Sequence, residues 1–254
     1  MFHDQERMSD SMKVLCVIPA RYASTRLPGK PLKDIAGKPM VCRVYERAAQ
    51  AHKVSRTLVA TDDERILQAV RDHGGEAMMT RKDHPTGTDR LAEVAASFPD
   101  VDLIINVQGD EPLIDPGLID QLASVFETDP ELCMATVKTE MFDEAEQTNP
   151  NNVKVVTDRQ GYALYFSRSL LPYPRHKGCP VYKHIGIYAY QREFLLQYAK
   201  MKTTPLEAAE SLEQLRALEN GCRIKVVETK STFVGVDTAE DLAKVNEIYK
   251  KMNS

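Results

Sequence analysis

Short apolar segments alternate along most of this chain with segments that have the spacing of amphipathic helices. The apolar runs at 14–18, 57–61 and 103–107 are typical of strands buried on both faces of a sheet. Helical spacing follows in between, for example at 38–51 and 116–126. Strands that alternate with helices of about 10–15 residues form parallel sheets covered on both faces. The sequence therefore predicts an α/β, Rossmann-like fold with a mostly parallel central sheet and helices on both faces.

The pattern changes in the second half of the chain. Residues 153–157, 162–167 and 184–190 have the composition of strands, with almost no helical segment between them. This run predicts an antiparallel subdomain, at about 151–200, inserted in the main sheet. Helices are expected again at 210–220 and after Thr238, where Thr238 and Asp241 have the spacing of a capping box. We expect a single domain at 13–254, preceded by a disordered extension at 1–12.

Two further helix starts are predicted from polar residues that precede an apolar stripe. Asp62 is placed to cap the helix that contains Ile66 and Val70. Thr88 is placed to cap the next helix, which begins at the end of a polar loop with Pro85 and Gly87.

Composition excludes several classes of function. The net charge of −4 disfavours a sequence-independent nucleic-acid binder, so any affinity for phosphate must be local. The five cysteines are scattered and form no Cys-x-x-Cys pair, which indicates neither a zinc site nor a disulfide framework and fits a reducing compartment. The first 12 residues lack the apolar centre of a signal peptide, and no apolar run approaches the ~20 residues of a membrane span. We expect a cytoplasmic protein.

A basic loop follows the first predicted strand. Arg21, Arg26 and Lys30 occur there within ten positions, together with two hydroxyl side chains and Gly29. Open α/β sheets bind their ligands at the carboxyl ends of the strands, and cations with free backbone N–H groups suit a polyanion such as a nucleoside triphosphate. The loop is not a Walker A motif, because Pro31 follows Lys30, and it is not Gly-x-Gly-x-x-Gly. A solvated basic turn is the alternative interpretation.

Two aspartates stand at other predicted strand ends. Asp110 comes just after the most apolar strand, and Asp237 lies between a strand and the last helix. Two carboxylates together with triphosphate oxygens would complete a Mg²⁺ shell, because this ion seldom uses an all-protein cage. The alternatives are a turn for Asp110 and a helix cap for Asp237.

Other polar residues have weaker signals. The loop at 81–90 is expected either to contact a nucleobase or phosphates, or to be the solvated first turn of a capped helix. His184 and Tyr188 share one face of a predicted strand, where a histidine is more often structural than catalytic. Glu213 and Gln214 lie in a helix with a clear apolar face, so that a solvent-facing pair is their alternative interpretation.

Eight motifs in order resemble the 3-deoxy-manno-octulosonate cytidylyltransferase family, the CMP-Kdo synthetases of Gram-negative bacteria. The resemblance begins in the basic loop, Ile18-Pro-Ala-Arg-Tyr-Ala-Ser-Thr-Arg-Leu-Pro-Gly-Lys-Pro-Leu32, and extends nearly to the last helix. The other motifs are Ala60-Thr-Asp62, Gly87-Thr-Asp-Arg90, Asn106-Val-Gln-Gly-Asp-Glu-Pro112, Tyr162-Ala-Leu-Tyr-Phe-Ser-Arg168, His184-Ile-Gly-Ile-Tyr-Ala-Tyr190, Leu212-Glu-Gln-Leu-Arg216 and Val236-Asp-Thr238.

The resemblance implies a Mg²⁺-assisted transfer of CMP from CTP to the sugar acid Kdo, which releases pyrophosphate and supplies lipopolysaccharide assembly. It also implies a homodimer. The catalytic residues that it implies are Arg21, Lys30, Gln108 and Asp110, and the metal ligands are Asp110 and Asp237. The implied nucleotide-binding residues are Pro19, Ala20, Arg21, Lys30, Arg81, Thr88 and Gln108. The implied sugar-binding residues are Arg26, Arg168, His184, Tyr188, Glu213 and Gln214.

One departure from the family concerns the loop at 170–183, which is shorter than in many members and is expected to border the sugar site. An 8-amino relative of Kdo therefore stays open as the substrate. Two rival functions also stay open. One is a cytidylyltransferase for a sialic acid or a related sugar acid, and the other is a sensor or scaffold that has kept a nucleotide pocket without catalysis.

Overall fold

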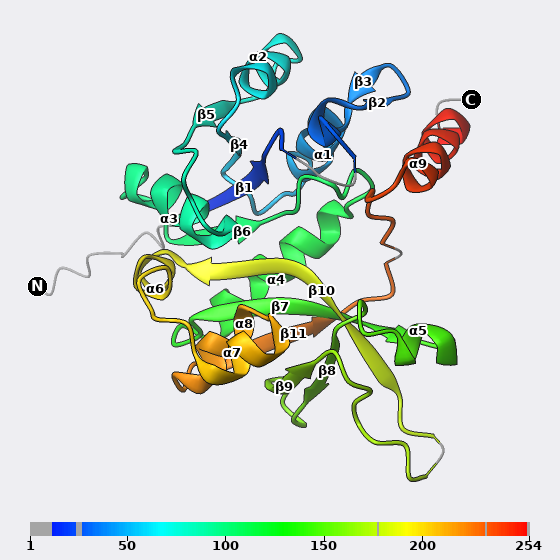
Figure 1. The fold of residues 1–254 in the computed structure, drawn as a ribbon. Helices are drawn as coiled ribbons and strands as arrows, with labels where there is room; N and C mark the ends of the chain where they lie inside the picture. The colour runs from blue at the N-terminus through cyan, green and yellow to red at the C-terminus, as the bar shows by residue number, and fades with distance from the viewer. Residues whose placement is uncertain (1–11, 24–26, 177, 232, 253–254) are drawn as a thin grey trace, which may run out of the picture.

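The computed structural model of the chain describes residues 12–23, 27–176, 178–231 and 233–252. Its centre is a sheet with the strand order β11-β7-β10-β6-β1-β4-β5, to which the β8–β9 hairpin is attached (Figure 1). The α/β fold predicted from the sequence is confirmed. The strands are β1 (Val14–Ala20), β4 (Arg56–Thr61), β5 (Ala77–Met79), β6 (Leu103–Asn106), β7 (Met134–Met141), β8 (Lys154–Thr157), β9 (Ala163–Ser167), β10 (Val181–Gln191) and β11 (Ile224–Glu228). A separate two-stranded sheet joins β2 (Asp34–Ile35) to β3 (Lys38–Pro39).

Strand β10 gives the sheet its mixed character. It lies between β6 and β7 and is antiparallel to both, whereas β1 is parallel to β4 and β6, and β11 is parallel to β7. The predicted antiparallel segment therefore extends into the middle of the main sheet. Its hairpin, β8–β9, is attached to β10 through the pair Lys154 and Lys183.

Helices cover both faces of the sheet. The helices are α1 (Met40–Ala48), α2 (Glu64–Asp72), α3 (Gly87–Ser97), α4 (Pro116–Thr128), α5 (Glu144–Thr148), α6 (Arg192–Tyr198), α7 (Pro205–Glu210), α8 (Gln214–Glu219) and α9 (Ala239–Met252), with a 3₁₀ turn η1 (Lys30–Leu32).

Each face of the sheet has its own core. In β1, Cys16 and Ile18 pack on the side of α1, α2 and α4, while Leu15 and Val17 pack on the side of α3, α6 and α8. This alternation explains why the strand is apolar at every position, as parallel strands buried on both faces are. A third, smaller core packs α9 against the β2–β3 sheet through Tyr249 and Ile35.

Three predictions about helices were wrong in detail. The cap of α2 is Asp63, whose carboxylate accepts a bond from the Arg65 amide, and not Asp62. The cap of α3 is Thr86, which forms a capping box with Asp89, and not Thr88. Both errors shift the cap by one or two residues, because neighbouring polar residues compete for the same position.

The segment at 210–220 is not one helix. It is divided at Ser211, whose φ of 51° is left-handed, so that α7 ends before it and α8 begins after Glu213. The short helix α6 was not predicted at all, because seven residues carry too little periodic signal. The capping box at the start of α9 is confirmed, since the Asp241 carboxylate accepts from the Thr238 amide and the Thr238 hydroxyl accepts from the Asp241 amide. Among the described residues, no helix is long and apolar enough to cross a membrane.

Candidate active site

Three predicted residues meet beyond the carboxyl ends of β1 and β6. The ammonium of Lys30 lies 2.7 Å from Asp110 Oδ2 and 2.9 Å from Asp237 Oδ1. The side chain of Lys30 is mostly buried, whereas those of Asp110 and Asp237 are 34% and 45% exposed to solvent. The carboxylates are therefore partly open to a ligand and share one ammonium, whose single positive charge balances only one of their two negative charges.

The backbone brings these residues together at two glycines and one hydrogen bond. Gly29 has a φ of 65°, which favours glycine, and it begins the turn that carries Lys30. A Cβ on Gly109 would lie only 2.8 Å from the carbonyl of Pro19, so only glycine lets the loop after β6 approach the loop after β1. The amide of Val236 donates to the carbonyl of Asp110 at 2.9 Å, which places Asp237 beside Asp110.

The charges of the cluster are coupled. Burial alone would lower the pKa of Lys30, but the adjacent Asp110 and Asp237 carboxylates outweigh it and hold this pKa above its ordinary value. Glu111 is next in the chain, and burial together with the charge of Asp110 raises the pKa of its carboxyl to about 7. The cluster thus keeps its lysine charged while a neighbouring carboxyl titrates near neutrality.

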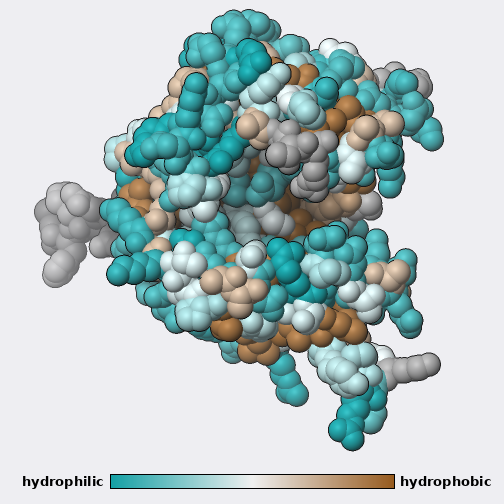
Figure 2. Space-filling model, viewed as in Figure 1, coloured by the Kyte–Doolittle hydropathy of each residue, from teal (hydrophilic) through white to brown (hydrophobic). Residues whose placement is uncertain are grey.

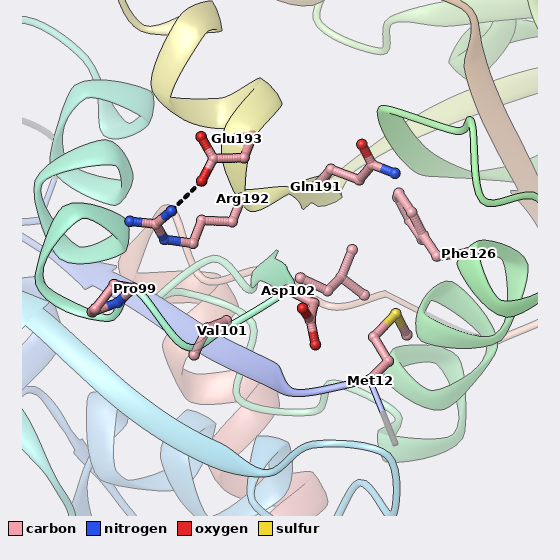
Figure 3. Close-up of a pocket in the computed structure, with 9 residues that line it drawn as sticks. Met12, Pro99, Val101, Asp102, Phe126, Gln191, Arg192 and Glu193 are labelled. Atoms are coloured by element: carbon pink, nitrogen blue, oxygen red, sulfur yellow. Dashed lines mark hydrogen bonds and ion pairs between the residues drawn. The ribbon is translucent and has the colours of Figure 1, made fainter. Parts of the chain in front are cut away.

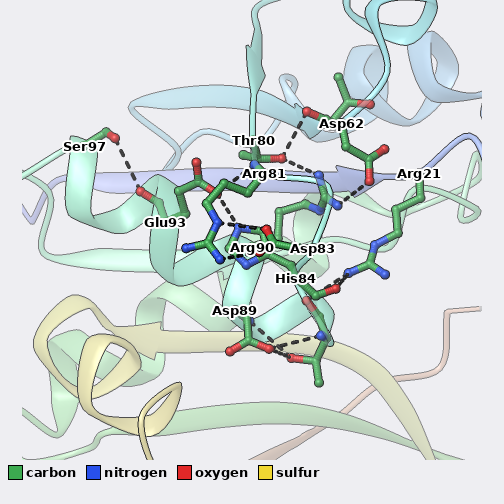
Figure 4. A network of polar contacts seen from close by, with 12 residues as sticks. Arg21, Asp62, Thr80, Arg81, Asp83, His84, Asp89, Arg90, Glu93 and Ser97 are labelled. Carbon is green, nitrogen blue, oxygen red and sulfur yellow. Dashed lines mark hydrogen bonds and ion pairs between the residues drawn. The ribbon is translucent and has the colours of Figure 1, made fainter.

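Arg21 points to the first turn of α3 (Figure 4). Its guanidinium donates to the carbonyl of His84 at 2.7 Å and to that of Thr86 at 3.2 Å. Arg21 therefore connects the loop after β1 with the loop that precedes α3. Pro19 and Ala20 precede it at the end of β1, where they pair with Ala60 and Thr61 of β4.

The loop before α3 is held by a polar network. Fully buried Arg90 pairs with Asp62 at 2.7 Å and also donates to the Thr80 hydroxyl, which ties α3 to the ends of β4 and β5 (Figure 4). His84 contacts Glu93 in the same network. Arg81, which the resemblance assigns to the nucleotide, lies on the surface and forms an ion pair with Asp83 at 2.7 Å.

A polar pocket of about 180 Å³ lies next to the Arg21 side of the site. Figure 2 shows the hollow between the part of the molecule that carries β1, β6 and α3 and the part that carries β10, α7 and α8. The pocket gathers five residues predicted from the sequence: Thr88, Gln108, Tyr188, Glu213 and Gln214. Its other lining residues are Gly87, Asn106, Met134, Tyr190 and Tyr198.

Two atoms in the wall of this pocket lack partners within the described part of the chain. They are the amide oxygen of Asn106 and the amide nitrogen of Gln214, both buried. A buried polar group without a partner costs roughly 1–3 kcal/mol, so its presence in a pocket wall requires an explanation. One acceptor and one donor suit a hydroxylated ligand, because a hydroxyl both donates and accepts.

Strand β10 supplies the aromatic side of the site. His184 Nε2 lies 3.0 Å from the Thr136 hydroxyl, and its ring packs edge-on against Phe166 and beside Tyr188. Burial lowers the pKa of His184 to about 3, so its imidazole is neutral at pH 7. Gln108 donates to the carbonyl of Gly186 at 3.0 Å, at an irregularity in the pairing of β10 with β7. This hydrogen bond fixes the side-chain amide of Gln108, which lines the polar pocket and lies two positions before Asp110.

One predicted sugar-binding arginine, Arg168, does not line this pocket in the described part of the chain. The guanidinium of Arg168 donates to the carbonyls of Glu210, Pro150 and Ser211, and Arg168 is absent from the described residues that line the pocket. No described residue of 170–183 lines it either. Arg26 lies outside the described residues, as does almost all of the extension predicted at 1–12.

A second cavity, of about 310 Å³, lies at the opposite edge of the sheet (Figure 3). It is lined by Met12, Asp102, Phe126, Arg192 and others, at the start of β6 and the end of β10. Although it is larger, it lies at the first residue of β6, whereas Asn106 ends this strand and Gln108 follows it. Parallel strands place ligands at their carboxyl ends, which favours the smaller pocket as the functional one.

Five lining residues received no site role in the sequence analysis: Gly87, Asn106, Met134, Tyr190 and Tyr198. Asn106 had a usable signal, because it is the polar residue that closes the otherwise apolar strand 103–106. The two tyrosines had none. Tyr190 and Tyr198 stack with their ring centroids 6.1 Å apart, and this contact depends on how α6 packs on β10.

Comparison with known proteins gives a consistent result. A family model described as cytidylyltransferase matches residues 15–226. The chain is 55% identical to the 3-deoxy-manno-octulosonate cytidylyltransferase of Geobacter sulfurreducens over 94% of this chain and 100% of that protein. It is 57% identical to the protein of the same name from Geotalea daltonii, over 94% of this chain and 99% of that one.

Solved structures agree with these relatives. A CMP:2-keto-3-deoxy-manno-octonic acid synthetase complexed with CTP superposes with a TM-score of 0.91 and 48% identity, over 94% of this chain and 99% of that one. The 4-diphosphocytidyl-2C-methyl-D-erythritol synthase of Anaerococcus prevotii has a TM-score of 0.64 at 14% identity, over 95% and 97% of the two chains, and shares the fold alone. With its sequence, its fold and its clustered polar residues in agreement, the chain belongs to the 3-deoxy-manno-octulosonate cytidylyltransferase family.

Proposed function

We propose that this protein transfers CMP from CTP to Kdo and releases pyrophosphate. The observation that carries the proposal is the cluster in which Lys30 joins Asp110 to Asp237, next to the polar pocket that contains Glu213 and Gln214. Triphosphate binding requires cations, and sugar binding requires a pocket with several fixed donors and acceptors. The two requirements are met side by side at one edge of the sheet.

The residues fit a magnesium ion. Asp110 and Asp237 offer the hard oxygen ligands that Mg²⁺ prefers, and both carboxylates approach the same ammonium, that of Lys30. In this proposal phosphate oxygens complete the magnesium shell. A bound Mg²⁺ would withdraw charge from the phosphate oxygens.

The nucleotide would lie along the loop after β1. Lys30 is placed to neutralise phosphate oxygens, and Arg21 to hold the wall formed by the loop before α3. Pro19, Ala20, Arg81 and Thr88 complete the proposed nucleotide site. Arg81 would have to exchange its exposed pairing with Asp83 for the ligand, which is an inexpensive exchange for a surface ion pair.

The sugar would lie in the polar pocket. Glu213 accepts hydrogen bonds from sugar hydroxyls in this proposal, and Gln214, Tyr188 and Gln108 add donors on the other sides. His184 supports Tyr188 from behind. Arg168 would act on the pocket through the backbone of Glu210 and Ser211, and Arg26 is proposed to pair with the sugar carboxylate, for which its planar fork is suited.

The reaction needs alignment more than covalent chemistry. The anomeric hydroxyl attacks the α-phosphorus in line, the bond to the β-phosphate breaks, and pyrophosphate leaves. Lys30 stabilises the developing negative charge, while Gln108 positions the reacting groups between the pocket and the aspartates. We further propose that the product supplies lipopolysaccharide assembly in the cytoplasm. The enzyme in this proposal is a homodimer that uses the segment 151–200.

Identification of the product tests the proposal. Purified protein is incubated with Mg²⁺, each of the four nucleoside triphosphates, and Kdo, 8-amino-Kdo or a sialic acid, and the products are identified by mass spectrometry. The proposal predicts CMP-Kdo and pyrophosphate from CTP and Kdo. Preference for either other sugar acid would replace Kdo in the proposal, and no nucleotide sugar from any pair would reject it.

A further inference from the structure

Glu213 sits at the end of a chain of buried charges that extends away from the pocket. Arg216 donates to Glu207 through Nε at 2.8 Å and Nη2 at 2.5 Å, and the same Nη2 lies 3.4 Å from Glu213 Oε1. The side chains of Arg216 and Glu207 are only 9% and 10% exposed, whereas that of Glu213 is 31% exposed and faces the pocket. The guanidinium is thus shared between a buried carboxylate and one that is open to ligand.

The opposite side of Glu213 is held by α3. The Thr88 hydroxyl donates to Glu213 Oε2 at 3.0 Å, and the Thr86 hydroxyl lies 3.4 Å from Oε1. The hydroxyl of Tyr198 donates to the backbone carbonyl of Glu213 at 2.6 Å. Oε2 thus has a partner on α3 and Oε1 one on α8, while Glu213 also lines the pocket.

We propose that Arg216, braced by Glu207, is a positioning residue that keeps the Glu213 carboxylate oriented as an acceptor for hydroxyl groups of the sugar. The inference rests on the proposed function, because it assigns the sugar to this pocket. A bidentate pair with Glu207 fixes the plane of the guanidinium, so that its third contact, to Glu213, has a fixed direction. Lysine, which is a point charge on a flexible stem, would not reproduce this geometry.

The charges around Glu213 act in opposite directions. Burial raises the pKa of Glu213, the Thr88 hydrogen bond and the Arg216 charge lower it, and the charges of Glu207 and Asp89 raise it. The groups that face Glu213 from the neighbouring elements are Arg216 on α8, Glu207 on α7, Thr86, Thr88 and Asp89 at α3, Tyr198 on α6, and Tyr188 and Tyr190 on β10. Removal of Arg216 and removal of the Glu207 charge should therefore shift the titration of Glu213 in opposite senses.

Carboxyl carbon NMR titration of the full-length, ligand-free protein tests the inference, with Glu213→Gln used to assign the signal. Arg216→Met should raise the pKa of Glu213, and Glu207→Gln should lower it. Arg192→Met removes a similarly buried arginine on α6 that, in the described part of the chain, contacts Glu193 and the carbonyl of Ala95 rather than Glu213, and it should leave the pKa of Glu213 unchanged. If Arg216 only holds α7 against α8, the two variants should leave the pKa of Glu213 unchanged or shift it in the same direction. Either result would overturn the inference.

Kinetics separate this inference from the proposed function. With CTP and Kdo as substrates, the acidic limb of the pH profile of kcat/KM for the sugar should shift in the same direction as the pKa of Glu213 in each variant. The KM for CTP should stay within about twofold of the wild-type value. Arg216→Lys should restore the pKa of Glu213 but not KM for the sugar. If the two variants shift the pKa of Glu213 in opposite directions but the protein does not turn over Kdo, the proposed function is rejected and the interaction of Arg216 with Glu213 is retained. If the protein turns over Kdo but the acidic limb of kcat/KM is the same in the variants as in wild type, the role of Arg216 is rejected. If Arg216→Met does not fold, the Glu207→Gln and Arg216→Lys results decide.

Discussion

Lys30 Nζ lies 2.7 Å from Asp110 Oδ2, although the two residues are 80 positions apart in the chain. The contact joins the loop after β1 to the loop after β6, two parallel neighbours in the sheet. Asp237 reaches the same ammonium from the segment between β11 and α9. Three separate segments thus converge on one charge.

Replacement of Lys30 by alanine should mainly impair the use of CTP. The variant loses the cation nearest to the proposed triphosphate site and leaves Asp110 and Asp237 to repel both each other and the phosphates. A charge-assisted hydrogen bond contributes about 1.5–3 kcal/mol, so kcat/KM for CTP should fall by roughly 10- to 150-fold. Steady-state kinetics with varied CTP measure this. Lys202→Ala, at an exposed position, is the control, and an unchanged KM and rate for Lys30→Ala would contradict the role.

Replacement of Asn106 by leucine should separate stability from activity. The substitution removes the unpartnered amide oxygen, so the free energy of unfolding should not decrease, while KM for the sugar should rise by about tenfold through loss of a hydrogen bond. Thr57→Val is the matched control, because the hydroxyl of Thr57 is also buried and unpartnered but lies on β4 and does not line the pocket. If Asn106→Leu leaves KM unchanged, Asn106 does not contact the sugar.

Replacement of Arg90 by methionine should strongly destabilise the fold. Arg90 is fully buried, and its removal leaves the Asp62 carboxylate without its cation, a situation that costs about 3–5 kcal/mol. The double variant Arg90→Met with Asp62→Leu should recover much of this loss, since both charges are then absent. Urea unfolding measures both, and additive losses in the double variant would show that the two residues are not coupled.

The neutral state of His184 should make stability depend on pH. Its pKa of about 3 in the folded chain lies below the ordinary value, so between that value and about pH 6.5 the unfolded chain binds a proton that the folded chain does not. This contribution to stability is complete above pH 6.5 and is lost as the pH falls toward 3. The difference in unfolding free energy between wild type and His184→Asn should therefore shrink from pH 7 to pH 5 in urea titrations. A difference that stays constant over this range would refute the assignment.

Local features of the sequence predicted the fold class, the strand-end loops and the convergence of Lys30 with Asp110 and Asp237. They did so because parallel strands bring their carboxyl ends to one edge whatever their order in the sheet. The place of β10 between β6 and β7 was not predictable, since pairing between distant strands leaves no local trace. The shared guanidinium of Arg216 was not predictable either, although its partners Glu207 and Glu213 lie only nine and three positions away. It depends on the turn at Ser211, a left-handed residue that is not glycine and that carries no warning in the sequence.

The sequence also could not show which of two threonines, Thr86 or Thr88, caps α3 and which one lies in the site. In Thr86-Gly-Thr88 either threonine satisfies the pattern of a helix cap. The structure assigns the cap to Thr86 and thereby frees the Thr88 hydroxyl to donate to Glu213. The family resemblance assigns Thr88 to the site, and the hydrogen bond from its hydroxyl to Glu213 is a physical reason for that assignment.

The most direct test of the central claim is the rate of pyrophosphate release from CTP and Kdo in the presence of Mg²⁺, measured for wild type, Asp110→Ala and Asp237→Ala. The proposed arrangement predicts that each substitution lowers the rate by about 100-fold or more, while circular dichroism and the melting temperature stay close to those of wild type. Asp100→Ala, which removes an exposed carboxylate paired only with Lys13 in the described chain, should retain full activity. Near-normal rates in both site variants would contradict the claim that these two aspartates and Lys30 form the catalytic centre.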